Sequence, residues 1–418
     1  MATGIPTKYT KSPEKGVTVA YDGKEPVESI LKSSHIPYCS VGSFGKPGSD
    51  NRFYFGDNLN GLLELSEDPE VCEKINLVYI DPPFSTGMRF EGKNQREAYT
   101  DYSTGGEFVE FLRKRLVLIH RILSPTGSVY VHLDQNMIFE IKLIMDEIFG
   151  QSNFRGMISR QKCSSKNTVS KTYGNITDYI LFYTKSSKYT WNPQYIPWDE
   201  ATIAKEYNCI AEDGRRFKKV PIHAPGVRKG ETGKPWRGML PPPGKHWQYT
   251  PEKLDELDAQ GRIYWSSNGN PRKIIYAEES KGTILQDIWQ DCRDSINQND
   301  QCTGYPTEKN IDLLKRIIIA SSNEGDLVLD CFSGSGTTLD AAQQLKRKWI
   351  GMDIGDEALR ATIVRFTQGL SAYGDYVKKK RIQTKLVTYD VPFTVYAIED
   401  LREIVEDVVS NLGVSFNE

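Results

Sequence analysis

Short apolar runs alternate along this chain with segments whose apolar residues recur at helical spacing. Strands are predicted where the runs are short and rich in β-branched or aromatic residues, at 52–57, 77–80, 128–133, 176–183, 327–329, 348–353, 386–391 and 393–398. Helices are predicted at 60–65, 107–123, 135–149, 311–322, 339–347 and 399–409. Gly150 follows the third helix as a stop signal. This alternation indicates an α/β fold in which helices cover a sheet.

The strand predicted at 77–80 runs directly into Asp81-Pro82-Pro83-Phe84. Neither proline can donate a hydrogen bond to a sheet ladder, so the strand must end there. Pro83 also biases Pro82 toward an extended backbone, which gives a rigid platform at the carboxyl end of the strand. Open α/β sheets bind their ligands at that edge.

This platform offers groups that suit a planar base with an exocyclic amino group. The Asp81 carboxylate can accept one amino hydrogen, the Pro82 carbonyl can accept the other, and Phe84 can stack on the ring. Two acceptors on one amino group draw its nitrogen toward a tetrahedral shape and aim the lone pair at an electrophile. Taken alone, an Asp-Pro-Pro sequence is more often an ordinary turn that carries a solvated carboxylate.

A second motif, at residues 325–338, favours the first interpretation. A short strand ends at Asp330, a turn of small residues follows, and a helical segment comes next. Glycines let a ligand approach the backbone, and the amides of a helix N-terminus point toward it. The following strand ends at Asp353, whose carboxylate suits the two hydroxyls of a ribose. The motif predicts a cofactor site, although a packing turn without a ligand has similar glycines.

Together the two motifs resemble those of the amino-methylating DNA methyltransferases, which use S-adenosylmethionine. Residues 81–84, D-P-P-F, are similar to the family motif that holds the target amino group, and 332–336, F-S-G-S-G, are similar to its cofactor motif. The catalytic motif comes first and the cofactor motif late, which resembles the β-class arrangement. The resemblance implies a Rossmann-like, S-adenosylmethionine-dependent methyltransferase sheet of α/β class. It also implies that the sheet is circularly permuted and carries an inserted target-recognition region.

The resemblance further implies roles for individual residues. The catalytic set is Asp81, Pro82, Pro83 and Phe84, and the cofactor set is Asp330, Phe332, Ser333, Gly334, Gly336, Thr337 and Asp353, with Thr307 and Lys309 bordering the methionine end. Three positions depart from the family pattern. Cys331 and Asn310 stand where the family often has proline, and Phe84 replaces the commoner tyrosine. None of these changes removes a group that the chemistry needs, and no metal is implied.

Composition places the chain among ordinary soluble proteins, with 38% hydrophobic and 26% charged residues. No apolar run reaches about 18 residues and the first residues lack an apolar core, so we expect no membrane span, no signal peptide and a cytoplasmic location. The seven cysteines include no C-x-x-C pair, which predicts reduced thiols and no zinc site. His132 lies inside an apolar run, where a structural role is expected.

Charge is distributed unevenly along the chain. The net charge is −2, yet residues 151–295 hold 23 Lys and Arg against 16 Asp and Glu. The same window contains six of the seven tryptophans, and its basic residues interleave with aromatic ones. Because cations neutralise phosphates and aromatic rings stack on bases, the window is predicted to recognise DNA. For any single tryptophan, a place in the core of a loop-rich insertion is the more ordinary interpretation.

These observations divide the chain into an N-terminal arm (1–48), a catalytic half (49–160), a target-recognition region (161–300, with sheet strands near 176–184), a cofactor-binding half (301–378) and a C-terminal extension (379–418). The predicted function is site-specific methylation of the N6 amino group of adenine in double-stranded DNA after base flipping. Methylation of N4 of cytosine and a DNA-recognition subunit without activity stay open as alternatives. Methylation of RNA or protein fits the basic and aromatic window less well. A homodimer and a restriction subunit on another polypeptide also stay open.

Overall fold

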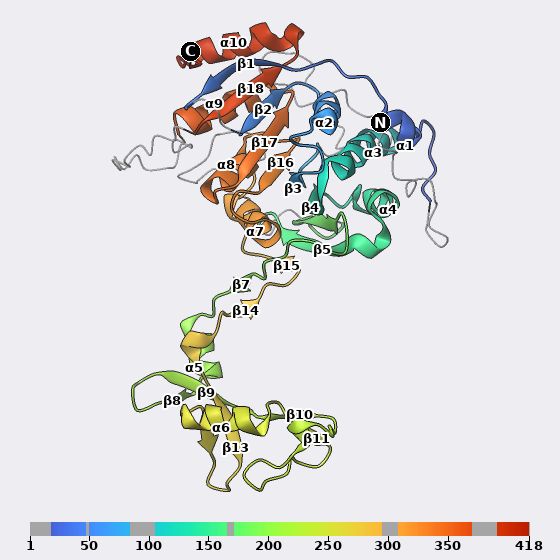
Figure 1. Ribbon diagram of the computed structural model, residues 1–418. Helices are drawn as coiled ribbons and strands as arrows, with labels where there is room; N and C mark the ends of the chain where they lie inside the picture. The colour runs from blue at the N-terminus through green and yellow to red at the C-terminus, as the bar shows by residue number, and fades with distance from the viewer. Residues whose placement is uncertain are drawn as a thin grey trace. The chain divides into compact units, whose positions relative to one another are not determined.

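The computed structural model describes residues 18–46, 50–83, 105–164, 171–294, 308–369 and 391–417. The chain divides into two compact units, a main unit (1–192 and 286–418) and an inserted unit (193–285). In the described part of the main unit, helices alternate with the strands of one ten-stranded sheet (Figure 1). The α/β class predicted from the sequence is therefore confirmed.

The strands of this sheet follow the order β1-β18-β2-β17-β16-β3-β4-β6-β5-β15. They are β1 Cys39–Phe44, β2 Arg52–Phe55, β3 Ile75–Ile80, β4 Leu123–Leu133, β5 Phe154–Gln161, β6 Thr177–Thr184, β15 Ile288–Trp289, β16 Leu327–Asp330, β17 Lys348–Asp353 and β18 Phe393–Ala397. The six strands from β18 to β4 are parallel. Strand β6 is antiparallel to both of its neighbours, and β1 closes the opposite edge antiparallel to β18.

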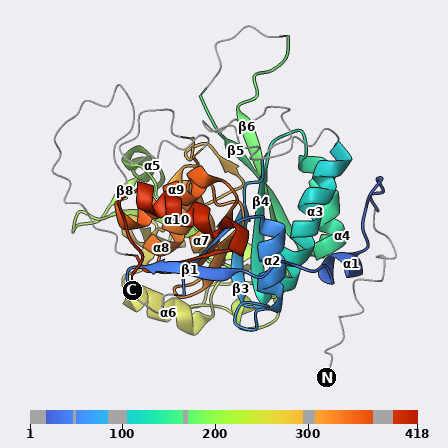
Figure 2. The same ribbon diagram turned by 90° about the horizontal axis from the view of Figure 1, so that it is seen from above.

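Helices lie on both sides of the sheet. Those described are α1 Val27–Leu31, α2 Asn58–Glu67, α3 Gly105–Ile122, α4 Ile138–Phe149, α7 Ile311–Ser321, α8 Thr337–Gln344, α9 Asp356–Thr367 and α10 Arg402–Asn411, with 3-10 turns η2 Gln151–Asn153 and η5 Glu399–Leu401. Figure 2 shows α3 and α4 on one side and α7, α8 and α9 on the other. Both faces are thus covered, as the continuous apolar runs of the parallel strands require.

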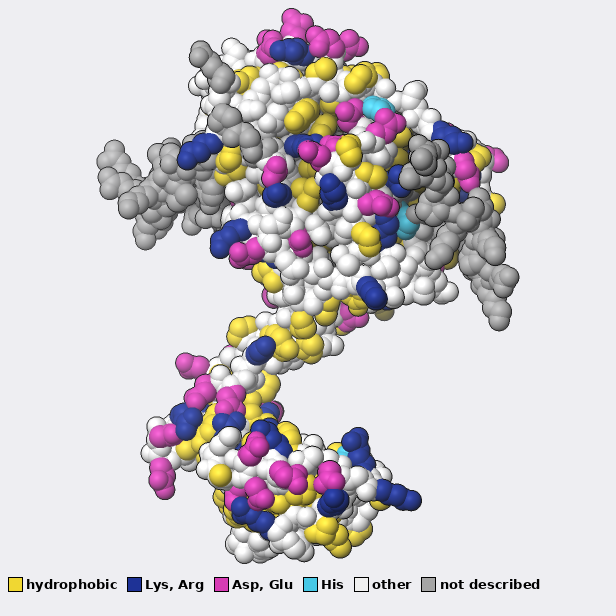
Figure 3. All heavy atoms as spheres, viewed as in Figure 1, with side chains coloured by type: hydrophobic (Ala, Val, Ile, Leu, Met, Phe, Trp, Pro, Cys, Tyr) yellow, Lys and Arg dark blue, Asp and Glu magenta, His cyan; other side chains and the backbone are white. Residues whose placement is uncertain are grey.

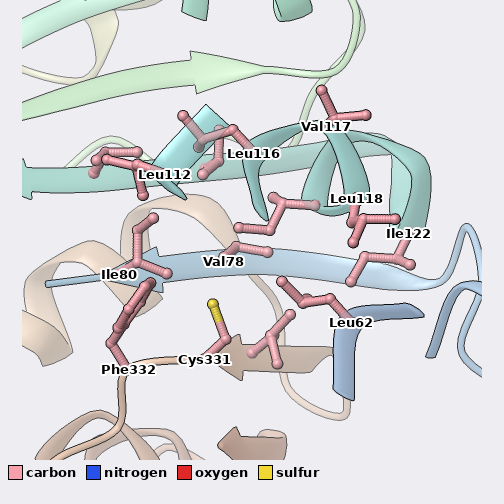
Figure 4. Close-up of a cluster of buried hydrophobic side chains, with 14 of the residues drawn as sticks. Leu62, Val78, Ile80, Leu112, Leu116, Val117, Leu118, Ile122, Cys331 and Phe332 are labelled. Carbon is pink, nitrogen blue, oxygen red and sulfur yellow. The ribbon is translucent and has the colours of Figure 1, made fainter. Parts of the chain in front are cut away.

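The long helix α3 explains how the catalytic strand is held. Its apolar stripe, predicted from the spacing within 107–123, contributes Leu112 and Leu116 to one buried cluster with Val78 and Ile80 of β3 (Figure 4). All four side chains are fully buried. Burial of each such side chain stabilises the fold by about 1.5–3 kcal/mol, so the carboxyl end of β3 is fixed by a rigid core.

Chain connectivity reverses between β16 and β3. From β16 the chain passes through α8 to the neighbour β17, whereas from β3 it passes through α3 to β4 on the other side. Such a switch point leaves a crevice at the carboxyl ends of the two central strands, where open α/β sheets bind ligands. Strand β3 precedes β16 in the sequence, as the predicted circular permutation requires.

Several boundaries differ from the prediction. The segment 1–48, expected to be an arm, contributes α1 and the edge strand β1, and the expected C-terminal extension contributes β18 and α10. Helix α4 begins at Ile138 rather than 135, and α8 spans Thr337–Gln344 rather than 339–347. The strand predicted at 386–391 lies almost wholly outside the described residues. None of the helices in the described ranges is long and apolar enough to cross a membrane.

The inserted unit is narrower than the predicted window of 161–300, because β5, β6 and β15 belong to the main sheet. Its elements are β7 Tyr195–Ile196, α5 Glu200–Glu206, β8 Cys209–Ile210, β9 Arg216–Pro221, β10 His223–Pro225, η3 Glu231–Gly233, β11 Lys245–Trp247, α6 Pro251–Ala259, β12 Ile263–Trp265, β13 Pro271–Tyr276, η4 Ala277–Glu279 and β14 Thr283–Ile284. Trp236 and Trp247 lie in its small core with Leu254. For these two tryptophans the core interpretation is correct.

Candidate functional site

Acidic residues stand at the carboxyl ends of five neighbouring parallel strands. Asp81 follows β3, Asp330 ends β16 and Asp353 ends β17, while Asp57 and Asp134 follow β2 and β4. The sheet therefore brings both sequence motifs to one edge. Asp81 and Asp353 lie close enough to Asp330 for their charges to raise its pKa further.

The Asp81 carboxylate has two different environments. Its Oδ2 lies 2.7 Å from Nζ of Lys309. Its Oδ1 is buried, and no group in the described part of the chain donates a hydrogen bond to it. An ionised carboxylate has about four acceptor positions, and a buried acceptor left without a donor costs about 1–3 kcal/mol. The site is therefore built with acceptor capacity that the described chain does not fill.

Lys309 is a buried cation at this edge. Although burial alone would lower its pKa, the carboxylates of Asp81 and Asp294 hold the pKa above the usual value for lysine. The sequence resemblance assigned Lys309 to the methionine end of a cofactor, whereas its ammonium here pairs with the catalytic carboxylate.

Behind Asp81 lies a buried histidine. His132, on β4, accepts or donates a hydrogen bond of 2.7 Å between Nδ1 and the Tyr79 hydroxyl, and this Nδ1 lies 4.0 Å from Asp81 Oδ1. Its Nε2 lies 2.9 Å from Asp178 Oδ2 on β6. Burial alone would raise the pKa of Asp178, but His132 and then Arg160 outweigh it and hold the pKa below its usual value.

Arg160 extends this cluster. Its guanidinium is fully buried on β5, where Nη1 lies 3.0 Å from Asp178 Oδ2 and Nη2 pairs with Asp294. Its Nε donates a hydrogen bond of 2.8 Å to the Cys292 carbonyl. A buried charge is tolerated only with partners. The Nη1 and Nη2 atoms of Arg160 therefore hold the Asp178 and Asp294 carboxylates in place.

The second motif forms a tight turn between β16 and α8. Asp330 is 2% exposed, and one of its oxygens accepts the backbone N–H of Phe332 at 3.0 Å. Burial, together with the charges of Asp81 and Asp353, raises the pKa of Asp330 to about 7. A carboxyl group kept half neutral in this way becomes fully ionised once a cation sits beside it.

Asp353 holds the turn from the neighbouring strand. Its Oδ2 accepts the Gly334 N–H and its Oδ1 the Gly355 N–H, both at 2.9 Å, and burial raises its pKa. Gly336 has φ +73°, and a Cβ there would lie 3.1 Å from Thr362 Oγ1. The turn thus requires glycine, and the remaining lone pairs of Asp353 are available to a ribose hydroxyl.

Arg365, from α9, ties the turn to the segment before α7. It donates to the Ser335 carbonyl at 2.9 Å, to Asp340 at 2.8 Å and to Glu308 at 2.6 Å. Thr337, predicted to bind the cofactor, is 5% exposed and its hydroxyl lies 2.8 Å from that of Ser335. The surroundings of Thr337 are therefore those of a residue that supports the turn.

The remaining predicted residues are placed as follows. Pro82 is buried and Pro83 half-buried directly after β3. Phe332 packs against Phe111 at a centroid distance of 6.1 Å, and Ser333 donates its hydroxyl to the Met352 carbonyl at 3.1 Å. Phe84 and Thr307, predicted to stack on the base and to border the cofactor, lie outside the described residues.

These surroundings fit S-adenosylmethionine. The glycine turn at 334–336 opens the backbone, and the buried Asp330 and Asp353 suit a cationic amino acid part and a ribose. A cation bound beside Asp330 would favour its ionised carboxylate, which burial otherwise disfavours.

Sequence reasoning missed Asp178, Arg160 and Asp294, and it gave His132 a purely structural role. A weak indication of this cluster was present in the sequence, because His132 and Asp178 interrupt apolar strand runs. A polar residue in such a run needs a buried partner. Which partner it has cannot be inferred from spacing, because the cluster is assembled from four separate segments.

A family described as DNA methylase, that of the N6/N4 methylases, matches residues 75–364. The chain is 44% identical to the type II methyltransferase M.EcaI of Enterobacter cloacae, over 95% of this chain and 88% of that protein. It is 28% identical to the DNA adenine methyltransferase YhdJ of Escherichia coli K12, over 73% of this chain and 80% of that protein. It is 27% identical to the Mod subunit of the type III restriction-modification enzyme StyLTI of Salmonella typhimurium, over 72% of this chain and 51% of that subunit.

Proposed function

This chain belongs to the N6/N4 DNA methylase family, and from this premise we propose that it methylates the N6 amino group of adenine in double-stranded DNA. S-adenosylmethionine, when bound, supplies an electrophilic methyl group. Asp330, the turn at 334–336 and Asp353 would hold it at the switch point. The target base is paired and stacked in a duplex, so it must first leave the helix, which costs a few kcal/mol.

The observation that carries this proposal is the unfilled acceptor capacity of the Asp81 carboxylate. It lies at the end of β3, next to the strand that carries the glycine turn. An adenine amino group offers two N–H donors, of which Asp81 accepts one and the Pro82 carbonyl is expected to accept the other. The acceptors hold the nitrogen lone pair toward the methyl donor and stabilise the positive charge that develops on nitrogen.

Adenine is proposed over cytosine on two grounds. The motif begins with Asp81, which the sequence resemblance associates with adenine enzymes, and the relative YhdJ is described as a DNA adenine methyltransferase. Cytosine is the second candidate, because its N4 amino group has the same two donors and the family includes N4 methylases.

We propose that the inserted unit recognises the DNA site. Lys219 lies over the partly exposed ring of Tyr264 at 3.5 Å, so a cation and an aromatic face are accessible together there. Lys218, the preceding residue of β9, lies over the buried ring of Tyr207 at 4.7 Å and points to the other face of the strand. Figure 3 shows Lys and Arg side chains interspersed with acidic ones on the visible face of this unit. Phosphate contacts by such cations would position the DNA, and contacts to base edges would specify the site.

We also propose two kinds of protein partner for this chain. M.EcaI is described as a type II methyltransferase and the StyLTI relative as a Mod subunit. A restriction subunit encoded separately, and a second copy of this chain, are consistent with such relatives.

The test is methyl transfer from labelled S-adenosylmethionine to duplex DNA, followed by digestion and mass identification of the modified nucleoside. We expect N6-methyladenine from the wild type and no product from Asp81→Ala, with cofactor binding retained. N4-methylcytosine as the sole product would establish the second candidate. DNA binding without transfer by the wild type would instead indicate a recognition subunit, and competition by RNA at matched salt would challenge DNA as the substrate.

A further inference from the structure

Among the described residues, the cluster behind Asp81 holds more carboxylates than cations. Three carboxylates, Asp81, Asp178 and Asp294, stand against two cations, Lys309 and Arg160. Asp330 on β16 also faces Asp81, and it adds a further negative charge when it is ionised. A low-dielectric site with excess negative charge stabilises a proton or a developing cation, which is what amino methylation produces.

His132 is the side chain of this cluster that can accept a proton. It is fully buried, and its Nε2 lies 2.9 Å from Asp178 Oδ2, where the anion favours a proton on Nε2 although the contact lacks hydrogen-bond geometry. Nδ1 then carries the lone pair, accepts the Tyr79 hydroxyl at 2.7 Å and lies 4.0 Å from Asp81 Oδ1. An imidazole whose tautomer is fixed by a buried carboxylate is the arrangement that serves as a proton acceptor in hydrolytic triads.

On the basis of the proposed function, we infer that His132, held by Asp178, receives through Asp81 the proton that the methylated amino group releases. Asp81 is the group that touches the substrate, and His132 and Asp178 act through it. A shift of about 1 Å by either side chain would bring Nδ1 and Oδ1 from 4.0 Å to hydrogen-bond distance.

The proton and electron balance of the step is as follows. The amino nitrogen forms the N–C bond with its lone pair while the C–S bond breaks and leaves its electron pair on sulfur. The nitrogen is then cationic, and one N–H proton passes to the Asp81 carboxylate while that bond's electrons return to nitrogen. Asp81 Oδ1 passes the proton to the Nδ1 lone pair of His132. The Tyr79 hydroxyl rotates to accept from Nδ1–H, Asp178 stabilises the imidazolium, and water removes the proton before the next turnover.

The test compares the rate of single-turnover methyl transfer, at saturating DNA and cofactor, in the wild type, H132Q and D178N. H132Q should react about 100-fold more slowly, the lower end of the range for a positioned general base. D178N should also react more slowly, since the imidazolium loses its anionic partner, while the affinities for DNA and cofactor stay unchanged.

Two readouts do not depend on turnover. The ¹⁵N imidazole shifts of His132 should report an Nε2–H tautomer in the wild type and lose that preference in D178N. Extrusion of a 2-aminopurine target should be equal in the wild type and H132Q. Tyr130→Phe is the matched control, because its buried hydroxyl, 2.7 Å from Ser321, lies on the same strand but outside the cluster. It should lower stability without changing the single-turnover rate or the His132 tautomer.

An H132Q variant with the wild-type single-turnover rate would overturn the inference. So would weakened DNA binding with an unchanged single-turnover rate, since that pattern belongs to a purely structural residue. If H132Q does not fold, D178N is the deciding variant, and a wild-type rate and an unchanged imidazole tautomer in D178N would also overturn the inference. If the wild type transfers no methyl group to DNA, the proposed function itself is wrong. This outcome differs from those that contradict only the role of His132.

Discussion

The ammonium of Lys309 lies 2.7 Å from the carboxylate of Asp81, although the two residues belong to different halves of the permuted sheet. The Lys309 side chain is 11% exposed and that of Asp81 18% exposed, so water screens neither charge well. The pair links the segment before the cofactor strand to the catalytic motif. Its main chemical consequence is that one oxygen of Asp81 is anchored by a cation, while the other is left to accept an amino hydrogen.

Lys309→Met should therefore impair catalysis more than cofactor binding. Without the ammonium, the Asp81 carboxylate loses the charged partner that fixes its position beside the target amino group. We expect kcat to fall at least about tenfold. Lys309→Arg, which keeps the charge, is the control. Equal kcat values for Lys309→Met and the wild type would contradict this role.

Cofactor binding should be linked to the ionisation of Asp330. The pKa of this buried carboxyl is raised to about 7, so the cofactor-free protein holds a proton there below neutral pH. S-adenosylmethionine is a net cation and favours the ionised form. Its affinity should fall about tenfold per pH unit below 7 and level off above it. Calorimetry in buffers of different ionisation enthalpy should show a proton released on binding near pH 6.

The same carboxyl should make the cofactor-free protein pH-sensitive. The folded pKa of about 7 lies above the unfolded value near 3.8, so the folded state binds the proton more tightly. Its contribution to stability is complete below about pH 4 and is lost as the pH rises through 7. Asp330→Asn should lack both this loss and the pH dependence of cofactor affinity. A parallel pH profile for Asp330→Asn and the wild type would contradict the assignment.

Much of this site could be predicted because it depends on local patterns. The run 348–353 and the strand ending at Asp330 are apolar segments of strand length, and their positions in the structure agree with the prediction. Strand β1 could not be predicted, since C-S-V-G-S-F lacks an apolar run and is stabilised by pairing with β18, far away in the sequence. The pairing of Lys309 with Asp81 was missed for the same reason, because no local spacing encodes a contact between distant segments.

Arg365→Met should destabilise the main unit strongly. It leaves the Asp340 carboxylate, 5% exposed, and the Glu308 carboxylate without their guanidinium partner. Breaking a buried pair in this way costs about 3–5 kcal/mol. Denaturant unfolding of the cofactor-free protein measures the loss. The double variant Arg365→Met with Asp340→Asn should regain part of it, because the uncompensated charge is removed.

The surface pair of Arg402 and Glu406 provides the matched control for that loss. Both side chains are about half exposed and one helical turn apart. Arg402→Met should cost no more than about 0.5 kcal/mol. Equal costs at the two arginines would show that burial of the Arg365 cluster does not contribute to stability as argued.

Replacing Pro193–Leu285 with a short Gly-Ser linker should separate cofactor binding from DNA recognition. The Leu285 N–H donates to the Gln194 carbonyl at 2.9 Å, so the two chain ends lie side by side and a short linker can join them. Asn192 anchors the outgoing chain to the carbonyls of Ile319 and Ser322 at 3.0 Å. The main unit has its own core, so we expect it to unfold cooperatively and to bind S-adenosylmethionine as the wild type does. Methylation at the recognition site should be lost, and retention of site-specific methylation by this variant would disprove the recognition role of the inserted unit.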